Sequence, residues 1–148
     1  MLIILNGLVL MIITLIKTVI RLISMIIKIN RNKDFVRLYK KGRTQGNRHF
    51  VVFFAKNGGK AASKPSRLGI STGKKCGNAV ERSRIRRIVR AAWRNAAKSS
   101  LIPKGYDVIF SAKQGAASLK STDVQRFLET RVIPSMTKLE AKAAVKNN

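Results

Sequence analysis

The chain has 148 residues, of which 31 are lysine or arginine and only six are aspartate or glutamate, so that its formal net charge is +25. Charge of this size opposes compaction by self-repulsion unless a polyanion neutralises it, which indicates a nucleic acid first and an anionic membrane surface second. The single cysteine excludes an intrachain disulfide and a cysteine-based zinc cluster, and the few acids with one histidine form no recognisable hydrolytic or metal-binding set.

The first 29 residues are strongly apolar. Their uncharged run from Leu2 to Ile16 is 15 residues long, shorter than the ~18 residues expected of a confident membrane span. The segment also lacks the basic start and the small-residue cleavage site of a secretory signal. Its charges are all positive: Lys17, Arg21 and Lys28.

Two interpretations of residues 1–29 stay open. Translation can start later, at Met11 or Met25, which in the second case leaves a short extended lead into a polar helix. Alternatively, the segment is a single membrane span with its cations on the cytoplasmic side. The abrupt change from Ile and Leu to Lys, Arg and Asn near residue 28 favours the late start. We expect a reducing compartment, the cytoplasm, because no disulfide is available.

From residue 30 the sequence is typical of an α+β domain that extends to about residue 138. A short helix over residues 32–41 is predicted, capped by Asn32 and stopped by Gly42. Phe35, Leu38 and Tyr39 share one face of this helix. Leu38 is predicted to pack in the core. The rings of Phe35 and Tyr39 are each expected either to pack in the core or to bind a ligand.

Three segments are predicted to be strands: residues 49–55, 67–74 and 105–113. In the first strand Phe50, Val52 and Phe54 point to one side, and the alternate residues, including Phe53, point to the other. Both faces are therefore apolar, so either both are covered by protein or one of them serves a ligand. A polar loop over residues 57–66 joins the first two strands.

A last helix is predicted to begin at a capping box formed by Thr122 and Gln125. Its inner face carries Val124, Phe127 and Leu128, and Pro134 is expected to limit it. The remaining residues, 139–148, are predicted to be a frayed tail.

The most informative segment is a basic helix that starts near residue 79. Asn78 is placed as its N-cap, and Glu81 is placed to complete a capping box. On a 3.6-residue wheel the apolar side chains gather on one side, with Trp93 at the margin. Beside them runs a line of cations spaced four residues apart, named here the cationic ridge: Arg82, Arg86, Arg90, Arg94 and Lys98. Arg87 joins this ridge, and Arg84 flanks its far side.

The ridge predicts a binding surface for a nucleic-acid backbone. Like charges four residues apart destabilise an isolated helix by a few tenths of a kcal/mol per pair, and a merely solvated face would include more glutamates than Glu81 alone. Lys74 and Lys75 lie just before the helix N-terminus, where free N–H groups can also meet phosphate. Guanidinium groups suit phosphate geometry better than lysines do.

Residues 74–87, KKCGNAVERSRIRR, closely resemble the signature of the protein component of bacterial ribonuclease P. The resemblance extends in consistent order to NKDF at 32–35 with Tyr39 and Gly42, to RLGIS at 67–71 and to KGYD at 104–107. One departure lies at the centre of the signature, where Ser83 replaces the asparagine of the family's Arg-Asn-Arg. The first 24 residues are foreign to the family.

This resemblance implies a small single α+β domain with a central mixed sheet, helices and a left-handed βαβ crossover. It also implies two RNA partners, the catalytic ribonuclease P RNA and precursor tRNA, whose 5′ leader the complex removes. The RNA-binding residues would be Lys74, Lys75, Asn78, Arg82, Ser83, Arg84, Arg86, Arg87, Arg90 and Arg94. The leader would lie in a cleft lined by Phe35, Tyr39 and Phe53.

The resemblance further implies that the protein holds no catalytic residue and no metal, and that magnesium is held mainly by the RNA. We expect no obligate protein partner. The strongest rival function is a structural RNA-binding protein, such as a ribosomal one, which would explain the ridge but not the ordered set of motifs. A DNA-binding helix is less favoured, because no dimerisation element or second recognition helix is evident.

Overall fold

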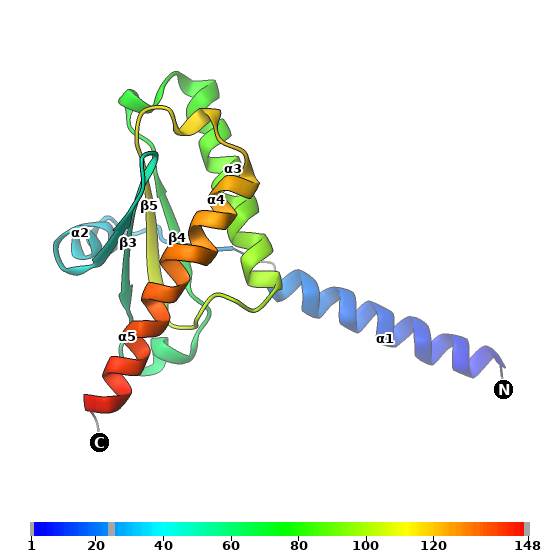
Figure 1. The fold of residues 1–148 in the computed structure, drawn as a ribbon. Coiled ribbons are helices and arrows are strands. Elements are labelled where there is room, and N and C mark those ends of the chain that lie inside the picture. Colours follow the sequence, from blue (N-terminus) through cyan, green and yellow to red (C-terminus); the bar gives the residue numbers. More distant parts are fainter. Residues whose placement is uncertain (1, 24–25, 147–148) are drawn as a thin grey trace.

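The computed structural model describes residues 2–23 and 26–146. At its centre is a five-stranded sheet in the order β1-β4-β5-β3-β2 (Figure 1). The strands are β1 (Ile27–Lys28), β2 (Arg43–Gly46), β3 (Phe50–Lys56), β4 (Arg67–Ser71) and β5 (Tyr106–Ala112). β1, β4 and β5 are parallel to one another, whereas β3 is antiparallel to β5 and β2 to β3, so the sheet is mixed, as expected.

Helices cover both faces of the sheet, but unequally. α3 (Ala79–Lys98), α4 (Ser121–Phe127) and α5 (Ile133–Lys146) lie on one face, and only α2 (Asn32–Lys41) lies on the other (Figure 1). The main core lies under the three helices and includes Phe50, Val52 and Phe54 of β3. The alternate side chains Val51 and Phe53 are half-buried on the α2 face.

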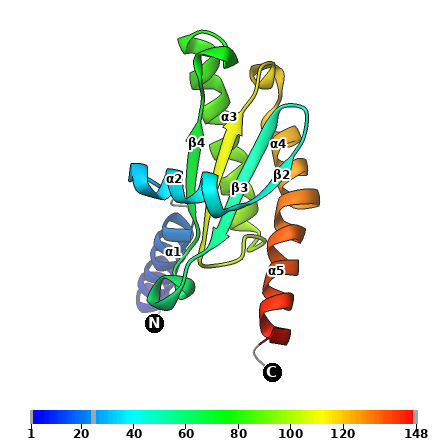
Figure 2. The same ribbon diagram turned by 90° about the vertical axis from the view of Figure 1, so that its left-hand side faces the viewer.

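The connection from β4 through α3 to β5 has an unusual hand. Viewed from the α2 side, β4 and β5 run in the same direction, with β5 to the right of β4 and α3 behind the sheet (Figure 2). This arrangement is a left-handed βαβ crossover, whereas nearly all such connections are right-handed. The prediction made from the family resemblance is confirmed.

α3 begins as predicted. The Asn78 side chain accepts a hydrogen bond from the Glu81 N–H at 2.9 Å, and the Glu81 carboxylate accepts one from the Asn78 N–H at 2.8 Å. This capping box satisfies two backbone donors that the first turn leaves free. The apolar face is buried against the sheet through Ile85, Ile88, Val89, Ala92, Trp93 and Ala96.

Several predicted boundaries are wrong. The domain begins before residue 30, because β1 pairs with β4 and the Ile29 side chain is buried beside α2. Asn32 lies inside α2, whose N-cap is Arg31. β4 ends at Ser71, and a 3₁₀ turn, η2 (Lys74–Cys76), follows it. β2 was not predicted, since its sequence RTQG carries no apolar alternation.

The C-terminal part is more helical than predicted. α4 starts at Ser121, where the Asp123 carboxylate accepts a hydrogen bond from the Lys120 N–H at 2.9 Å, so the Thr122 cap was wrong. A π-helical turn, η4 (Leu128–Val132), places Pro134 in the first turn of α5, where a missing N–H is tolerated. The predicted frayed tail is helical through Lys146, with Leu139 packed on the core, and residues 147–148 lie outside the described part.

The apolar N-terminal segment forms the helix α1 (Leu2–Ile23), which projects away from the domain (Figure 1). Its side chains from residue 3 to residue 19 are exposed. Among the described residues, no helix combines the length and the hydropathy needed to cross a membrane.

Candidate nucleic-acid interface

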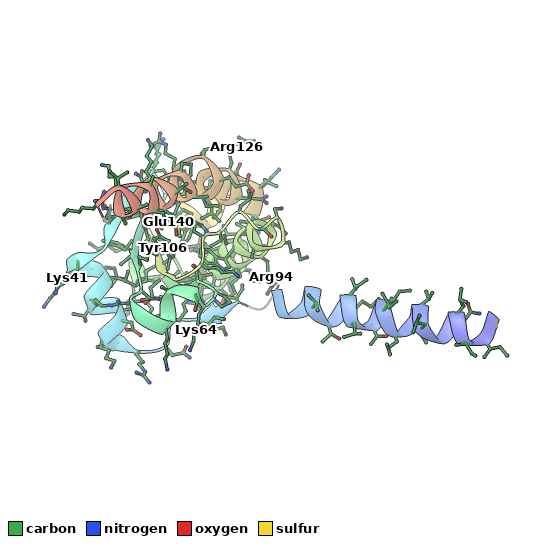
Figure 3. The ribbon with its side chains drawn as sticks, turned by 90° about the horizontal axis from the view of Figure 1, so that it is seen from below. Lys41, Lys64, Arg94, Tyr106, Arg126 and Glu140 are labelled. Carbon is green, nitrogen blue, oxygen red and sulfur yellow. The ribbon has the colours of Figure 1, made fainter. Side chains whose placement is uncertain are left out.

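The cationic ridge lies along α3 beside its buried apolar face. Because that face fixes the helix on the sheet, the ridge is presented on a rigid support. Arg82, Arg86 and Arg90 are half-buried, and Arg94 and Lys98 are exposed. Positive charge also lies outside the ridge, as the outward positions of Lys41, Lys64 and Arg126 show (Figure 3).

The cations of α3 are not neutralised within the protein. In the described part of the chain, every ion pair within 4.0 Å involves Arg37, Lys56 or Arg67, and none involves an α3 residue. Glu81 is the one acid of the helix, and its carboxylate serves the capping box. The ridge therefore lacks a carboxylate counter-charge, which a nucleic-acid backbone would supply.

The arginines near the start of α3 differ in how firmly they are held. Arg84 donates to the backbone oxygens of Ala117 at 2.8 Å and Leu119 at 3.3 Å, so it ties α3 to the loop before α4. Arg86 donates to the Thr72 hydroxyl at 2.8 Å. The buried Nε of Arg82 finds no hydrogen-bond partner among the described residues. Arg82 thus differs from Arg84 and Arg86, whose guanidinium groups are held by bonds within the domain.

The remaining predicted RNA-binding residues gather around the same end of α3. Lys74 and Lys75 are exposed on η2, and Arg87 is exposed on the helix. The Ser83 hydroxyl lies 3.3 Å from an Arg86 nitrogen, so it helps to orient that guanidinium. The Asn78 side-chain oxygen is already used by the capping box, which leaves its amide N–H₂ as the group available to a ligand.

The three predicted cleft aromatics form a continuous row on the other face of the sheet. The Tyr39 ring meets the Phe53 ring at 84° with 4.9 Å between centroids, and Phe35 lies 6.4 Å from Tyr39. Tyr39 is the most open of the three at 42% exposed, and the other two are half-buried. This row, Phe35, Tyr39 and Phe53, is called the aromatic row below.

Gly69 of β4 allows Phe35 to sit close to the sheet. A Cβ atom at position 69 would lie 3.0 Å from Phe35 Cζ and 3.2 Å from a side-chain carbon of Ile109. Any larger residue would therefore push the Phe35 ring away from the sheet. The glycine of RLGIS is needed here for a close approach.

The ridge and the aromatic row meet at the β1–β4 edge of the sheet. A surface cavity of about 150 Å³ is lined there by Arg86 and Arg90 from α3, by Phe35 from α2 and by Gly69 and Ile70 from β4. Lys28 and Asn30 also line it. A single polyanionic strand could thus pass from the cationic groups to the aromatic rings without crossing the domain.

A cluster that sequence reasoning missed lies beside this row. Asp107 of β5 is fully buried and accepts hydrogen bonds from both Arg67 of β4 and Arg37 of α2. Burial raises the pKa of the Asp107 carboxyl, but the hydrogen bonds from Arg67 and Asn57 and the positive charges of Arg67 and Arg37 together outweigh it, so the net pKa is lowered. Asp107 in KGYD and Arg67 in RLGIS lie in motifs of the family resemblance, but nothing in the sequence pairs them with each other or with Arg37.

The described part of the chain offers no obvious site for a metal. The described residues contain no group of three or more metal-ligating side chains. Each of the six carboxylates already accepts a structural bond: Asp34 and Asp107 from arginines, Glu81 and Asp123 from backbone N–H groups, Glu129 from Gln125 and Glu140 from Lys56. The donor set therefore does not fit a protein-bound magnesium ion.

Fold and surface together define a small basic α+β domain of the nucleic-acid-binding class. The family model described as Ribonuclease P matches residues 26–133, a span that contains the whole sheet, the ridge and the aromatic row. The chain belongs to the ribonuclease P protein family. α1 lies outside the matched span.

Similar proteins agree with this assignment. The chain is 42% identical over 102 residues to a ribonuclease P protein component of Staphylococcus epidermidis, covering 69% of this chain and 84% of that protein. It is 32% identical over 104 residues to the Clostridioides difficile component, covering 70% and 87%. The predictions of the family and of the RNA-binding class are confirmed.

Solved structures have the same fold. The Staphylococcus aureus RNase P protein matches with a TM-score of 0.61 at 36% identity, over 77% of this chain and 97% of that one. The Thermotoga maritima RNase P protein matches with a TM-score of 0.57 at 30% identity, over 68% and 90%. The predicted fold class is therefore confirmed.

Proposed function

We propose that this protein is the protein subunit of ribonuclease P and assists the endonucleolytic removal of the 5′ leader from precursor tRNA. The observation that carries this proposal is the junction of two surfaces at one sheet edge. The un-neutralised ridge on α3 suits a folded RNA backbone, and the aromatic row suits the bases of a single strand. The cavity lined by Arg86, Arg90 and Phe35 connects them.

The cationic ridge is the surface for the catalytic RNA. Its guanidinium groups, with Lys74 and Lys75, neutralise phosphates and release counterions. If about six phosphates are neutralised, the affinity falls by ~10³ or more between 50 and 200 mM salt. Arg82, Arg86 and Arg90 of the ridge are the residues at which RNA contacts are expected.

The aromatic row is the surface for the leader. Stacking of a base on an aromatic ring contributes roughly 1–3 kcal/mol and tolerates any sequence, because every base has a π-face. This tolerance suits a protein that must accept many different leaders. The exposed ring of Tyr39 is the most accessible platform.

Bond cleavage is assigned to the RNA rather than to protein side chains. The carboxylates of the chain are occupied by arginines, backbone N–H groups and other partners, and His49 is the only histidine. Magnesium, held mainly by the RNA, supplies the metal-ion chemistry in this proposal. The protein contributes by lowering the repulsion between two RNAs and by holding the leader. A cytoplasmic location is expected, since the single cysteine cannot form an intrachain disulfide.

The decisive experiment is cleavage of a precursor tRNA by a bacterial ribonuclease P RNA at low millimolar magnesium, with and without the full chain. Cleavage that depends on the protein supports the proposal. A triple variant with Arg82, Arg86 and Arg90 changed to alanine is the matched control and should not stimulate. Normal RNA binding without any stimulation would instead favour a structural RNA-binding protein.

A further inference from the structure

α2 is held on the sheet by a small apolar contact. The buried side chains on this face are Ile29, Leu38 and Ile109, with Phe35 and Phe53 partly buried around them. The opposite face of the sheet buries a far larger set of side chains. Apolar burial alone therefore fixes α2 much less firmly than it fixes α3.

The second attachment of α2 is ionic and centres on Asp107. The Asp107 carboxylate accepts hydrogen bonds from Arg67 Nε and Nη2, both at 2.7 Å, and from Asn57 Nδ2 at 2.9 Å. Arg37 of α2 donates to the same carboxylate. Asp34, one turn earlier on α2, lies 3.4 Å from Arg67. The network thus joins α2 to β4, to β5 and to the segment that follows β3.

The residues that make these bonds alternate along α2 with the residues of the aromatic row. Asp34 is adjacent to Phe35, and Tyr39 follows Arg37 by two positions. A rotation or a lift of α2 would therefore move both rings at once. Phe35 would lose its close packing against Gly69, and Tyr39 would lose its edge-to-face contact with Phe53.

We propose that Asp107 is a positioning residue for leader binding, which holds α2 on the sheet so that Phe35 and Tyr39 stay aligned with Phe53. This inference rests on the proposed function. Asp107 is completely buried, so it acts through α2 and does not touch RNA. Loss of its charge releases Arg37, whose side chain is 40% exposed and can turn to solvent. The main core under α3 is untouched by this change.

The test compares tRNA binding by the holoenzyme reconstituted with full-length wild type or Asp107→Asn. We expect the Kd for precursor tRNA to rise at least about fivefold, which corresponds to loss of one stacking platform. The Kd for mature tRNA and the affinity for the catalytic RNA should stay within about twofold. Lys56→Ala is the matched control, because it breaks an ion pair with Glu140 on the other side of the domain and should change none of these values.

A double variant separates positioning from a general structural effect. In a Tyr39→Ala background, Asp107→Asn should raise the precursor Kd by clearly less than it does in the wild-type background, since one of the two rings that it positions is already gone. Full additivity of the two changes, or an unchanged precursor-to-mature ratio in Asp107→Asn, would overturn the proposal.

Arg37→Gln keeps the inference testable if Asp107→Asn does not fold. It removes the bond from α2 and leaves the Arg67–Asp107 pair in place, so the same selective loss is expected. Arg37→Lys should restore part of the affinity. If the wild type itself binds precursor and mature tRNA equally, the proposed leader site fails and the positioning role fails with it.

Discussion

The ring of Tyr39 on α2 stands edge-on to the ring of Phe53 on β3, with 4.9 Å between their centroids. Such a pair contributes about 0.5–1.5 kcal/mol beyond its buried area. The two rings therefore hold each other in place before a ligand arrives, and little side-chain entropy remains to be lost on binding. This pre-arrangement makes the aromatic row suitable for a single strand of variable sequence.

Phe53→Ala is expected to weaken binding of precursor tRNA by roughly fivefold to 100-fold, because one stacking platform and its contact with Tyr39 are lost. The Kd of mature tRNA, which has no leader, should not change. Phe53→Leu keeps apolar volume without an aromatic face and serves as the control for packing. Equal losses for the two tRNAs would contradict the assignment of the cleft.

Arg82→Ala is expected to weaken binding to the catalytic RNA and to reduce the slope of log K against log salt by about one. The melting temperature should stay close to that of the wild type, because the Nε of Arg82 has no hydrogen-bond partner in the described part of the chain. Filter binding at several salt concentrations measures the affinity and its salt slope, and thermal unfolding measures the melting temperature.

Two further variants control the Arg82 experiment. Arg84→Ala should lower the melting temperature as well as the affinity, since Arg84 bonds to the backbone before α4. Lys138→Ala removes one exposed charge on α5 and should leave the RNA affinity unchanged. An equal loss in Lys138→Ala would mean that total charge, rather than the ridge, sets the affinity.

Tyr106 should make the protein sensitive to alkali. Burial, aided by Glu140, raises the pKa of Tyr106 to about 12, and its hydroxyl donates to the Met136 carbonyl at 3.0 Å. An unfolded tyrosine ionises near pH 10, so this stabilisation is complete below about pH 10 and is lost as the pH rises to about 12. The free energy of unfolding, measured with urea, should exceed that of Tyr106→Phe by less and less over that range, and the difference should shrink by roughly 2–3 kcal/mol. A constant difference would contradict the burial argument.

Asp107 should make the protein less stable in acid. Its pKa in the folded protein is lowered, so its stabilisation is present above the unfolded value of about 4 and is lost as the pH falls below it. The free energy of unfolding of the wild type, measured with urea, should therefore begin to fall below about pH 5 and continue to fall as the pH drops past about 4, the pKa of an unfolded aspartate. Asp107→Asn should show a flatter dependence over the same range, and parallel curves would show that other carboxylates dominate.

Removal of residues 1–24 is expected to leave precursor tRNA cleavage unchanged. The family match begins at residue 26, and α1 contacts α3 only near one end and projects away from the sheet and the aromatic row. The measurement is the cleavage rate of the reconstituted complex with residues 25–148 against the full chain. N-terminal mass analysis of the natural protein then tests the late start, which a mass that includes residues 1–24 would refute.

The parts of the fold that depend on local chemistry could be predicted from the sequence. The capping box of Asn78 and Glu81 needs only residues three apart, and the apolar face of α3 follows from its periodicity. β2 could not be predicted, because its polar residues are held by pairing with β3 rather than by their own preference. Pro134 was misleading for a similar reason, since a π-helical turn accommodates it.

The exposed residues of the candidate site could be predicted from the sequence, but the buried network around Asp107 that holds them in place could not. The cations and the aromatic rings stand out by residue type and spacing. Their meeting at the β1–β4 edge depends on the sheet order, and the partners of Asp107 come from α2, β4 and the segment after β3. Such contacts between distant segments leave no periodic signal in one sequence.

The alternation along β3 gives this strand two separate roles. Phe50, Val52 and Phe54 are buried under the helices, whereas Val51, Phe53 and Ala55 face α2 and are only half-covered. In the proposed function, the main core and the leader surface therefore use interleaved positions of one strand. A library randomised at residues 51, 53 and 55 should yield mostly folded proteins that differ widely in their preference for leaders and that lose stability mainly through the α2 contact. Randomisation at 50, 52 and 54 should yield few folded proteins. The recognition surface can thus diversify between lineages without rebuilding the core beneath it.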